Sequence, residues 1–280
     1  MTPPEHGAEG AGPFTTRLTW HRPEGETVVW ESRLARKRGA LSVRGPGGTV
    51  SASRTTDAGA LGRLRRLNSV ASGAFILGGL LFALGAGVAQ FGSGDPVESA
   101  SIYFVGGLFF SAGGYTSLLQ VLNAPRHSEG GGPLATAGWR WWGYEPMRVD
   151  WLSTFVLFAG TLVFGVNLLD SFLQGLTVQQ TNRLIWTPDV IGCVLFLVSG
   201  HLAFVEICHR SRPCLRSRSL GWWVVAVNQL GSVLFMVAAL AAFTRPTTQS
   251  LVNTDIANWG TLCGALCFSL GGVLQAFERP

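Results

Sequence analysis

The sequence predicts an all-α integral membrane protein whose six transmembrane helices form three repeated two-helix hairpins. Three observations support this fold class: six apolar runs of membrane-spanning length, basic residues concentrated on one side of the predicted membrane, and a recurring pattern of Gly and Phe. Only 13% of the 280 residues are charged, and the mean hydropathy is +0.31. Soluble domains carry about 25% charged residues, so much of this chain's surface is unsuited to water.

The six apolar runs define the expected spans. About 20 apolar residues in an α-helix cross a hydrocarbon core of roughly 30 Å. The runs that meet this requirement cover residues 69–91, 101–122, 151–172, 189–208, 221–243 and 258–277. Six such runs joined by short polar links are improbable for the core of a soluble protein. We therefore expect hairpins over residues 69–122, 151–208 and 221–278, with a linker over residues 123–150.

Residues 1–68 precede the first span and hold 11 of the 21 Lys and Arg residues. We expect a basic cytoplasmic tail that is partly disordered, above all over its first dozen residues. Residues 30–38 could form a short basic helix that lies on anionic lipid. The tail contains no recognisable nucleic-acid-binding module, so binding to nucleic acid is not expected.

The basic residues also predict the orientation. Cytoplasmic segments next to membrane spans are enriched in Lys and Arg. In this chain 19 of the 21 cations precede the first span, follow the sixth, or lie after the second and fourth, whereas the remaining loops hold only Arg183 and Arg245. We therefore expect a multi-pass protein of the plasma (inner) membrane with both termini in the cytoplasm. Its expected partner is the lipid bilayer, and a homo-oligomer is compatible with this arrangement.

A Gly/Phe pattern recurs in the even-numbered spans, where Gly is followed by Phe, by a second Gly and by Gln or Glu. The copies are Gly106-Phe110-Gly114-Gln120, Gly192-Phe196-Gly200-Glu206 and Gly264-Phe268-Gly272-Glu278. A shorter Gly/Phe pattern occurs in the odd-numbered spans as Gly78-Phe82, Gly160-Phe164 and Gly231-Phe235.

The four positions of each even-numbered copy share one helix face. Glycine lets a neighbouring backbone approach closely, so these faces are expected to pack against other helices. The plainer interpretation is that Gly and Phe are simply common in this chain. If the hairpins surround a pseudo-threefold axis, Gln120, Glu206 and Glu278 converge on a polar mouth; if the hairpins pack in a row, they do not.

The hairpins resemble the YrhK-type domain, a small bacterial two-helix membrane unit. The last hairpin carries this resemblance best, in residues 228–235 and 258–268, and the first carries it weakly. The whole body is similar to uncharacterised six-helix actinobacterial membrane proteins. These motifs concern helix packing, so the resemblance implies a fold and no catalytic residues.

Several polar side chains are predicted at or near membrane depth, where ionisable groups are costly and are often functional. The candidates are Gln120, Asp170, His201, Glu206, Asn228 and Glu278. Asp170 is expected near the outer face and His201 nearer the middle, so a direct pair between them is not expected. A hydrogen bond to a neighbouring helix accounts for His201 at least as well as a functional role, and Glu206 and Glu278 could be ordinary interfacial carboxylates.

The five cysteines are odd in number, and none lies in a segment that we place on the outer side. A disulfide framework is therefore not expected. The spacing of Cys208, His209 and Cys214 does not match a zinc site, and a fourth ligand is missing. We expect no metal, no cofactor and no catalytic residue, because no phosphate-binding, dinucleotide-binding or hydrolase motif is present.

These observations favour a non-enzymatic structural or envelope-associated membrane protein of unknown biochemical role. The alternative is a transporter or channel for a small solute or ion, in which polar groups of the repeats would line a path. Transporters often interrupt their helices near the membrane midplane, and no Pro lies inside these spans, which favours the first interpretation. A membrane-bound redox enzyme would need His pairs for haem, and only His201 lies within a span.

Overall fold

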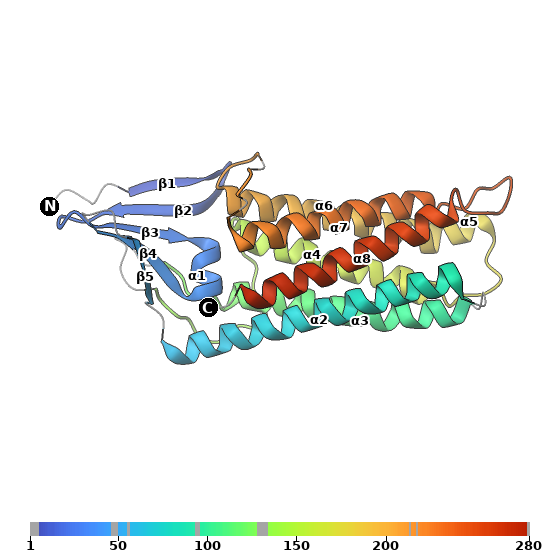
Figure 1. The fold of residues 1–280 in the computed structure, drawn as a ribbon, viewed down its shortest axis with the longest axis horizontal. Coiled ribbons are helices and arrows are strands. Elements are labelled where there is room, and N and C mark those ends of the chain that lie inside the picture. Colours follow the sequence, from blue (N-terminus) through green and yellow to red (C-terminus); the bar gives the residue numbers. More distant parts are fainter. Residues whose placement is uncertain are drawn as a thin grey trace.

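Six long helices lie side by side, and an antiparallel sheet covers one end of them in the computed structural model (Figure 1). The structure describes residues 6–45, 50–54, 57–92, 96–127, 134–212, 214–216 and 218–278. Both ends of the described chain lie at the end of the helices that carries the sheet (Figure 1). We call this the domain end of the bundle and the opposite end the far end.

The six long helices are the predicted spans. They are α2 (Ala58–Phe91), α3 (Pro96–Leu122), α4 (Val149–Asp170), α6 (Thr187–Cys208), α7 (Leu220–Ala241) and α8 (Thr254–Phe277). All are long and apolar enough to cross a membrane, which confirms the prediction of a multi-pass membrane protein. A short helix α5 (Val178–Thr181) and a π-helical turn, η2 (Asn182–Trp186), run directly into α6.

The helices form a closed ring. Consecutive contacts run from α2 to α3, α4, α6, α7 and α8, and α8 packs back against α2. A row of three hairpins would lack this last contact between the first and sixth spans. The hairpins therefore surround a common axis instead of lying in a row.

Glycine and phenylalanine interlock within each hairpin. A Cβ added to Gly78 would lie 2.9 Å from the ring of Phe110, and one added to Gly106 would lie 2.8 Å from that of Phe82. The second hairpin repeats this exchange between Gly160 and Phe196 and between Gly192 and Phe164; the third repeats it between Gly231 and Phe268 and between Gly264 and Phe235. Each ring thus fills the notch left by a missing side chain on the partner helix.

The last glycine of each even-numbered copy faces the next hairpin. Gly114 lies against Phe158 of α4, and Gly200 lies against Gln229 of α7. Gly272 lies against α2, where an added Cβ would be 3.0 Å from Ile76 Cγ1 and 3.1 Å from the carbonyl oxygen of Ser72. The nine Gly and Phe residues of the even-numbered copies therefore all face other helices.

We predict that Gly272→Leu destabilises the bundle by about 1–3 kcal/mol or more, because the added side chain must push α8 away from the backbone of α2. The measurement is the midpoint of thermal unfolding in mild detergent. Gly165→Leu on α4 is the matched control, since no atom lies within 4 Å of its added Cβ. Equal losses in the two variants would contradict the proposed close packing at Gly272.

The N-terminal region differs from the prediction. Instead of a partly disordered tail, it forms a sheet with the strand order β1-β2-β3-β4-β5, so an all-α fold is too narrow a description. The strands are β1 (His6–Ala11), β2 (Phe14–His21), β3 (Thr27–Glu31), β4 (Ala40–Arg44) and β5 (Val50–Arg54), and the short helix α1 (Ser32–Arg38) joins β3 to β4. Residues 1–5 of the expected disordered stretch lie outside the described residues.

Alternating burial explains why this region folds. Thr16, Leu18 and Trp20 of β2 are buried, whereas the residues between them point away, as one face of a strand requires. The buried face packs with Val28, and Leu134 of the linker completes the same core. The alternation of side chains with a period of two along β2 was the available signal in the sequence.

A disulfide joins Cys208 to Cys214, with 5.6 Å between their Cα atoms, so the expectation of no disulfide was wrong. α6 ends at Cys208, and His209 follows in the left-handed conformation with φ 54°. This turn redirects the chain and lets Cys214 return to the end of the helix. Spacing along the sequence does not reveal such a reversal.

Candidate functional site

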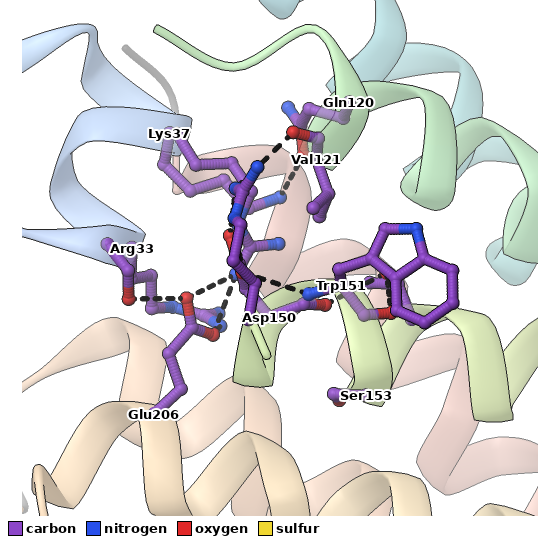
Figure 2. A network of polar contacts seen from close by, with 12 residues as sticks. Arg33, Lys37, Gln120, Val121, Asp150, Trp151, Ser153 and Glu206 are labelled. Atoms are coloured by element: carbon purple, nitrogen blue, oxygen red, sulfur yellow. Dashed lines mark hydrogen bonds and ion pairs between the residues drawn. The ribbon is translucent and has the colours of Figure 1, made fainter. Parts of the chain in front are cut away.

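The helix α1 covers the domain end of the helical ring and directs its cations into it (Figure 2). Arg36 and Lys37 are only 5% and 4% exposed, and Ser32 is also buried. Gly39, in the left-handed conformation, ends α1 and donates its N–H to the carbonyl oxygen of Ala35. The expected contact of α1 with anionic lipid is therefore replaced by contact with the bundle.

Arg36 pairs with Glu206 near the end of α6. Its Nη2 donates to Glu206 Oε1 at 2.9 Å and to Oε2 at 2.7 Å, and the Ser32 hydroxyl donates to Oε1 at 3.0 Å. Glu206 is only 2% exposed, so both charges are buried. A buried carboxylate needs such partners, because its water shell is lost.

Arg33 pairs with Glu278 at the end of α8. Its Nε and Nη2 each donate to one carboxylate oxygen at 2.7 Å, which is the two-pronged geometry that a guanidinium group favours. Burial alone would raise the pKa of Glu278, but Arg33, with Lys37 and Arg36, holds it below its ordinary value. Burial likewise opposes the charge of Arg33, and Glu278 and Glu206 more than compensate, so the pKa of Arg33 is raised.

Lys37 is held by amides instead of carboxylates. Its Nζ donates to Asn68 Oδ1 of α2 at 2.6 Å and to Gln120 Oε1 of α3 at 3.0 Å. The amide nitrogens of these two residues donate in turn to the carbonyl oxygens of Gln275 and Leu64. Burial lowers the pKa of Lys37 to about 7, against the attraction of Glu278.

Three of the predicted polar residues thus meet around one helix. Gln120, Glu206 and Glu278 come from α3, α6 and α8, and each accepts hydrogen bonds from α1. The sequence pattern pointed to these three side chains but not to Arg33 and Lys37 as their partners. We call these contacts of α1 with the bundle the mouth network.

The other polar candidates lie elsewhere. Asn228 of α7 lies inside the ring, where its Oδ1 would be 2.0 Å from a Cβ added to Gly271. His201 is exposed on the outer surface of the bundle, and Asp170 lies at the far end of α4. The structure therefore does not bring Asp170 and His201 together.

A cavity of about 110 Å³ lies beneath the mouth network. Arg33, Arg36 and Lys37 line it toward the domain, and Phe196 and Phe268 line it toward the far end. Between them its wall is polar, since Ser153 and Ser199 contribute to it and exchange hydrogen bonds with each other's carbonyl oxygens at 2.9 and 2.8 Å. We call this the domain-side cavity.

A layer of six phenylalanine rings crosses the middle of the ring of helices. Its members are Phe82, Phe110, Phe164, Phe196, Phe235 and Phe268, one from each helix. Neighbouring rings in this phenylalanine layer have centroids 5.3–6.2 Å apart. The void within the layer measures about 10 Å³, close to the least space that one water occupies.

A second cavity, of about 280 Å³, lies on the other side of the phenylalanine layer. Phe82, Phe164 and Phe235 form its floor, and Asp189 and Trp186 line it near the far end. We call this the far cavity. The domain-side cavity and the far cavity thus lie along one axis, and the apolar phenylalanine layer separates them.

No metal site is evident in the described part of the chain, where no three His, Cys, Asp or Glu side chains gather to hold an ion. While their disulfide is formed, Cys208 and Cys214 cannot serve as thiolate ligands. In comparisons with known proteins, the sequence matches no family model, no curated protein and no solved structure.

We predict that Glu206→Gln lowers stability by about 3–5 kcal/mol, because it leaves Arg36 buried without a full countercharge. Limited proteolysis should then release the N-terminal sheet, and the midpoint of thermal unfolding in detergent should fall. Glu26→Gln is the control, since its ion pair with Arg22 is largely exposed and worth at most about 1 kcal/mol. A double variant, Arg36→Met with Glu206→Met, should recover much of the lost stability. Equal unfolding midpoints for the wild-type protein, Glu206→Gln, Glu26→Gln and the double variant would refute the role of this pair.

Proposed function

We propose that this protein is non-enzymatic and passes a small polar solute or ion along the axis of its membrane bundle. The observation that carries this proposal is the pair of cavities that the phenylalanine layer separates. A bundle with a purely structural or envelope-associated role, which the sequence alone favoured, needs no cavities on its axis. If the axis is a path for solute, the structure described above is its closed form.

Two barriers close the proposed path. The phenylalanine layer leaves no room for a hydrated ion, and apolar constrictions of this kind exclude water and charge. The mouth network closes the domain end, because α1 fills it with the basic side chains Arg33, Arg36 and Lys37. Passage requires that both barriers move.

The helix irregularity that the sequence did not suggest also supports this proposal. The π-helical turn η2 interrupts the continuous helical segment Val178–Cys208, and Trp186 at its end lines the far cavity. π-Helical turns occur mostly as single turns inside α-helices and are frequent at functional sites. Transporters likewise place irregular backbone where it lines a cavity.

We further propose that the three hairpins arose by duplication and belong with YrhK-type domains. The support is their equivalent contacts, since each hairpin exchanges two phenylalanine rings for two glycine notches. Each then presents one further glycine to the next hairpin.

We also propose that Arg63 and Arg66, and not α1, contact anionic lipid, because both are exposed at the domain end of α2. A homo-oligomer and the absence of nucleic-acid binding remain expectations.

We predict that Phe196→Ala speeds the collapse of a potassium or proton gradient across vesicles that contain the purified protein. Loss of this ring opens the phenylalanine layer, and a barrier lower by ~1.4 kcal/mol corresponds to a rate about tenfold higher. Phe91→Ala is the matched control, because Phe91 is 72% exposed at the far end of α2. Equal gradient collapse in the wild-type protein and both variants would refute an axial path.

For the location we propose the inner membrane, with both termini in the cytoplasm, because 18 of the 20 cations in the described residues fall in segments at the domain end. A fluorescent protein fused to the C-terminus should then fluoresce, whereas alkaline phosphatase fused there should be inactive. In the cytoplasm the Cys208–Cys214 pair should be largely reduced, since disulfides are rare in that compartment. An active phosphatase fusion would place the sheet and the disulfide outside.

A further inference from the structure

The far cavity combines aromatic walls with one carboxylate. Its aromatic lining residues are Phe82, Tyr103, Phe164, Trp186 and Phe235. Asp189 is the only charged side chain among its described lining residues. Amide and hydroxyl groups complete the wall, contributed by Asn167, Ser171, Thr181, Thr244, Asn258 and Thr261.

The carboxylate of Asp189 has little compensation from the protein. Among the described residues, its one side-chain hydrogen bond comes from Cys193 Sγ, 3.8 Å away and one turn along the same helix. By contrast, Glu206 and Glu278 at the domain end are each paired with arginine. A carboxylate at membrane depth that faces a cavity without a protein cation provides a place for a cationic ligand.

The aromatic walls select among cations. The face of an aromatic ring attracts an ammonium group, and rings arranged around a cavity form the usual binding site for alkylammonium ions. Calcium sites usually combine several carboxylates, whereas no three His, Cys, Asp or Glu side chains gather to hold an ion in the described part of the chain. The volume of about 280 Å³ is roughly twenty times what one water needs, so a small organic ion has room.

We propose that the far cavity binds a small organic ammonium ion, with Asp189 as its countercharge and the aromatic rings of Trp186, Phe164 and Phe235 around its alkyl groups. This inference builds on the proposed function, because it names the class of solute that would travel along the axis. Binding can nevertheless be measured without transport.

The test uses the full-length protein in mild detergent and alkaline buffer, where carboxylates are ionised. The probes are choline, tetramethylammonium and 3,3-dimethyl-1-butanol, which has the shape of choline but no charge. We expect saturable binding of the two cations by equilibrium dialysis and a higher midpoint of thermal unfolding in their presence. The neutral alcohol should bind at least about tenfold more weakly.

Two substitutions locate the site. Asp189→Asn should weaken choline binding at least about tenfold, whereas Asp170→Asn should leave it unchanged, because Asp170 lies at the same end but outside the cavity lining. If Asp189→Asn fails to fold, Asp189→Glu keeps the charge, and the comparison of choline with the neutral alcohol in the wild-type protein still decides. Equal binding of the charged and neutral probes, or no saturable binding, would overturn the proposal.

The outcome of the choline-binding test can be distinguished from the outcome of the gradient test of the axial path. Phe196 does not line the far cavity, so gradient collapse in Phe196→Ala tests passage alone. Collapse without choline binding would leave the path in place and exclude this class of solute. Choline binding without any effect of Phe196→Ala would keep the ammonium site and exclude passage through the phenylalanine layer.

Discussion

The burial of three basic side chains at the domain end is the constraint on which the arrangement depends. Arg33, Arg36 and Lys37 lie on one short helix, and none can leave water without an acceptor from the bundle. The ends of α3, α6 and α8 must therefore meet at one depth and around one axis. Replacing such pairs by apolar residues can be neutral for stability, whereas removing one partner is costly, so the network contributes mainly to the specific position of the sheet on the ring.

The cavities follow from how a ring of six helices fills its own axis. Glycine notches let six large rings meet at one level, and there the axis is nearly solid. Above and below that level the linings include small or polar residues such as Ser153, Ser199 and Ala238, and open space remains on the axis. One packing rule thus accounts for both the close helix contacts and the open spaces.

The features that depend on local composition could be predicted from the sequence. The six spans were predictable from apolar length, and Gln120, Glu206 and Glu278 from their common place in the pattern. The sheet was missed because its strands are short and several of them contain Gly or Arg. The partner of Glu206 was missed because Arg36 lies 170 positions away, and the cavities were missed because volume depends on how all six helices pack.

One helix touches every feature of the axis, and this decides how the parts can be coupled. α6 carries Asp189 in the far cavity, Phe196 in the phenylalanine layer, Glu206 in the mouth network and Cys208 in the disulfide. A helix moves largely as a rigid element, so a shift of α6 that withdraws Phe196 must also strain the pair between Arg36 and Glu206. The π-helical turn η2 directly before α6 is the one place in that segment where the backbone already departs from regular geometry. Physical coupling between the two ends therefore needs only this helix and its two neighbours in the ring, α4 and α7.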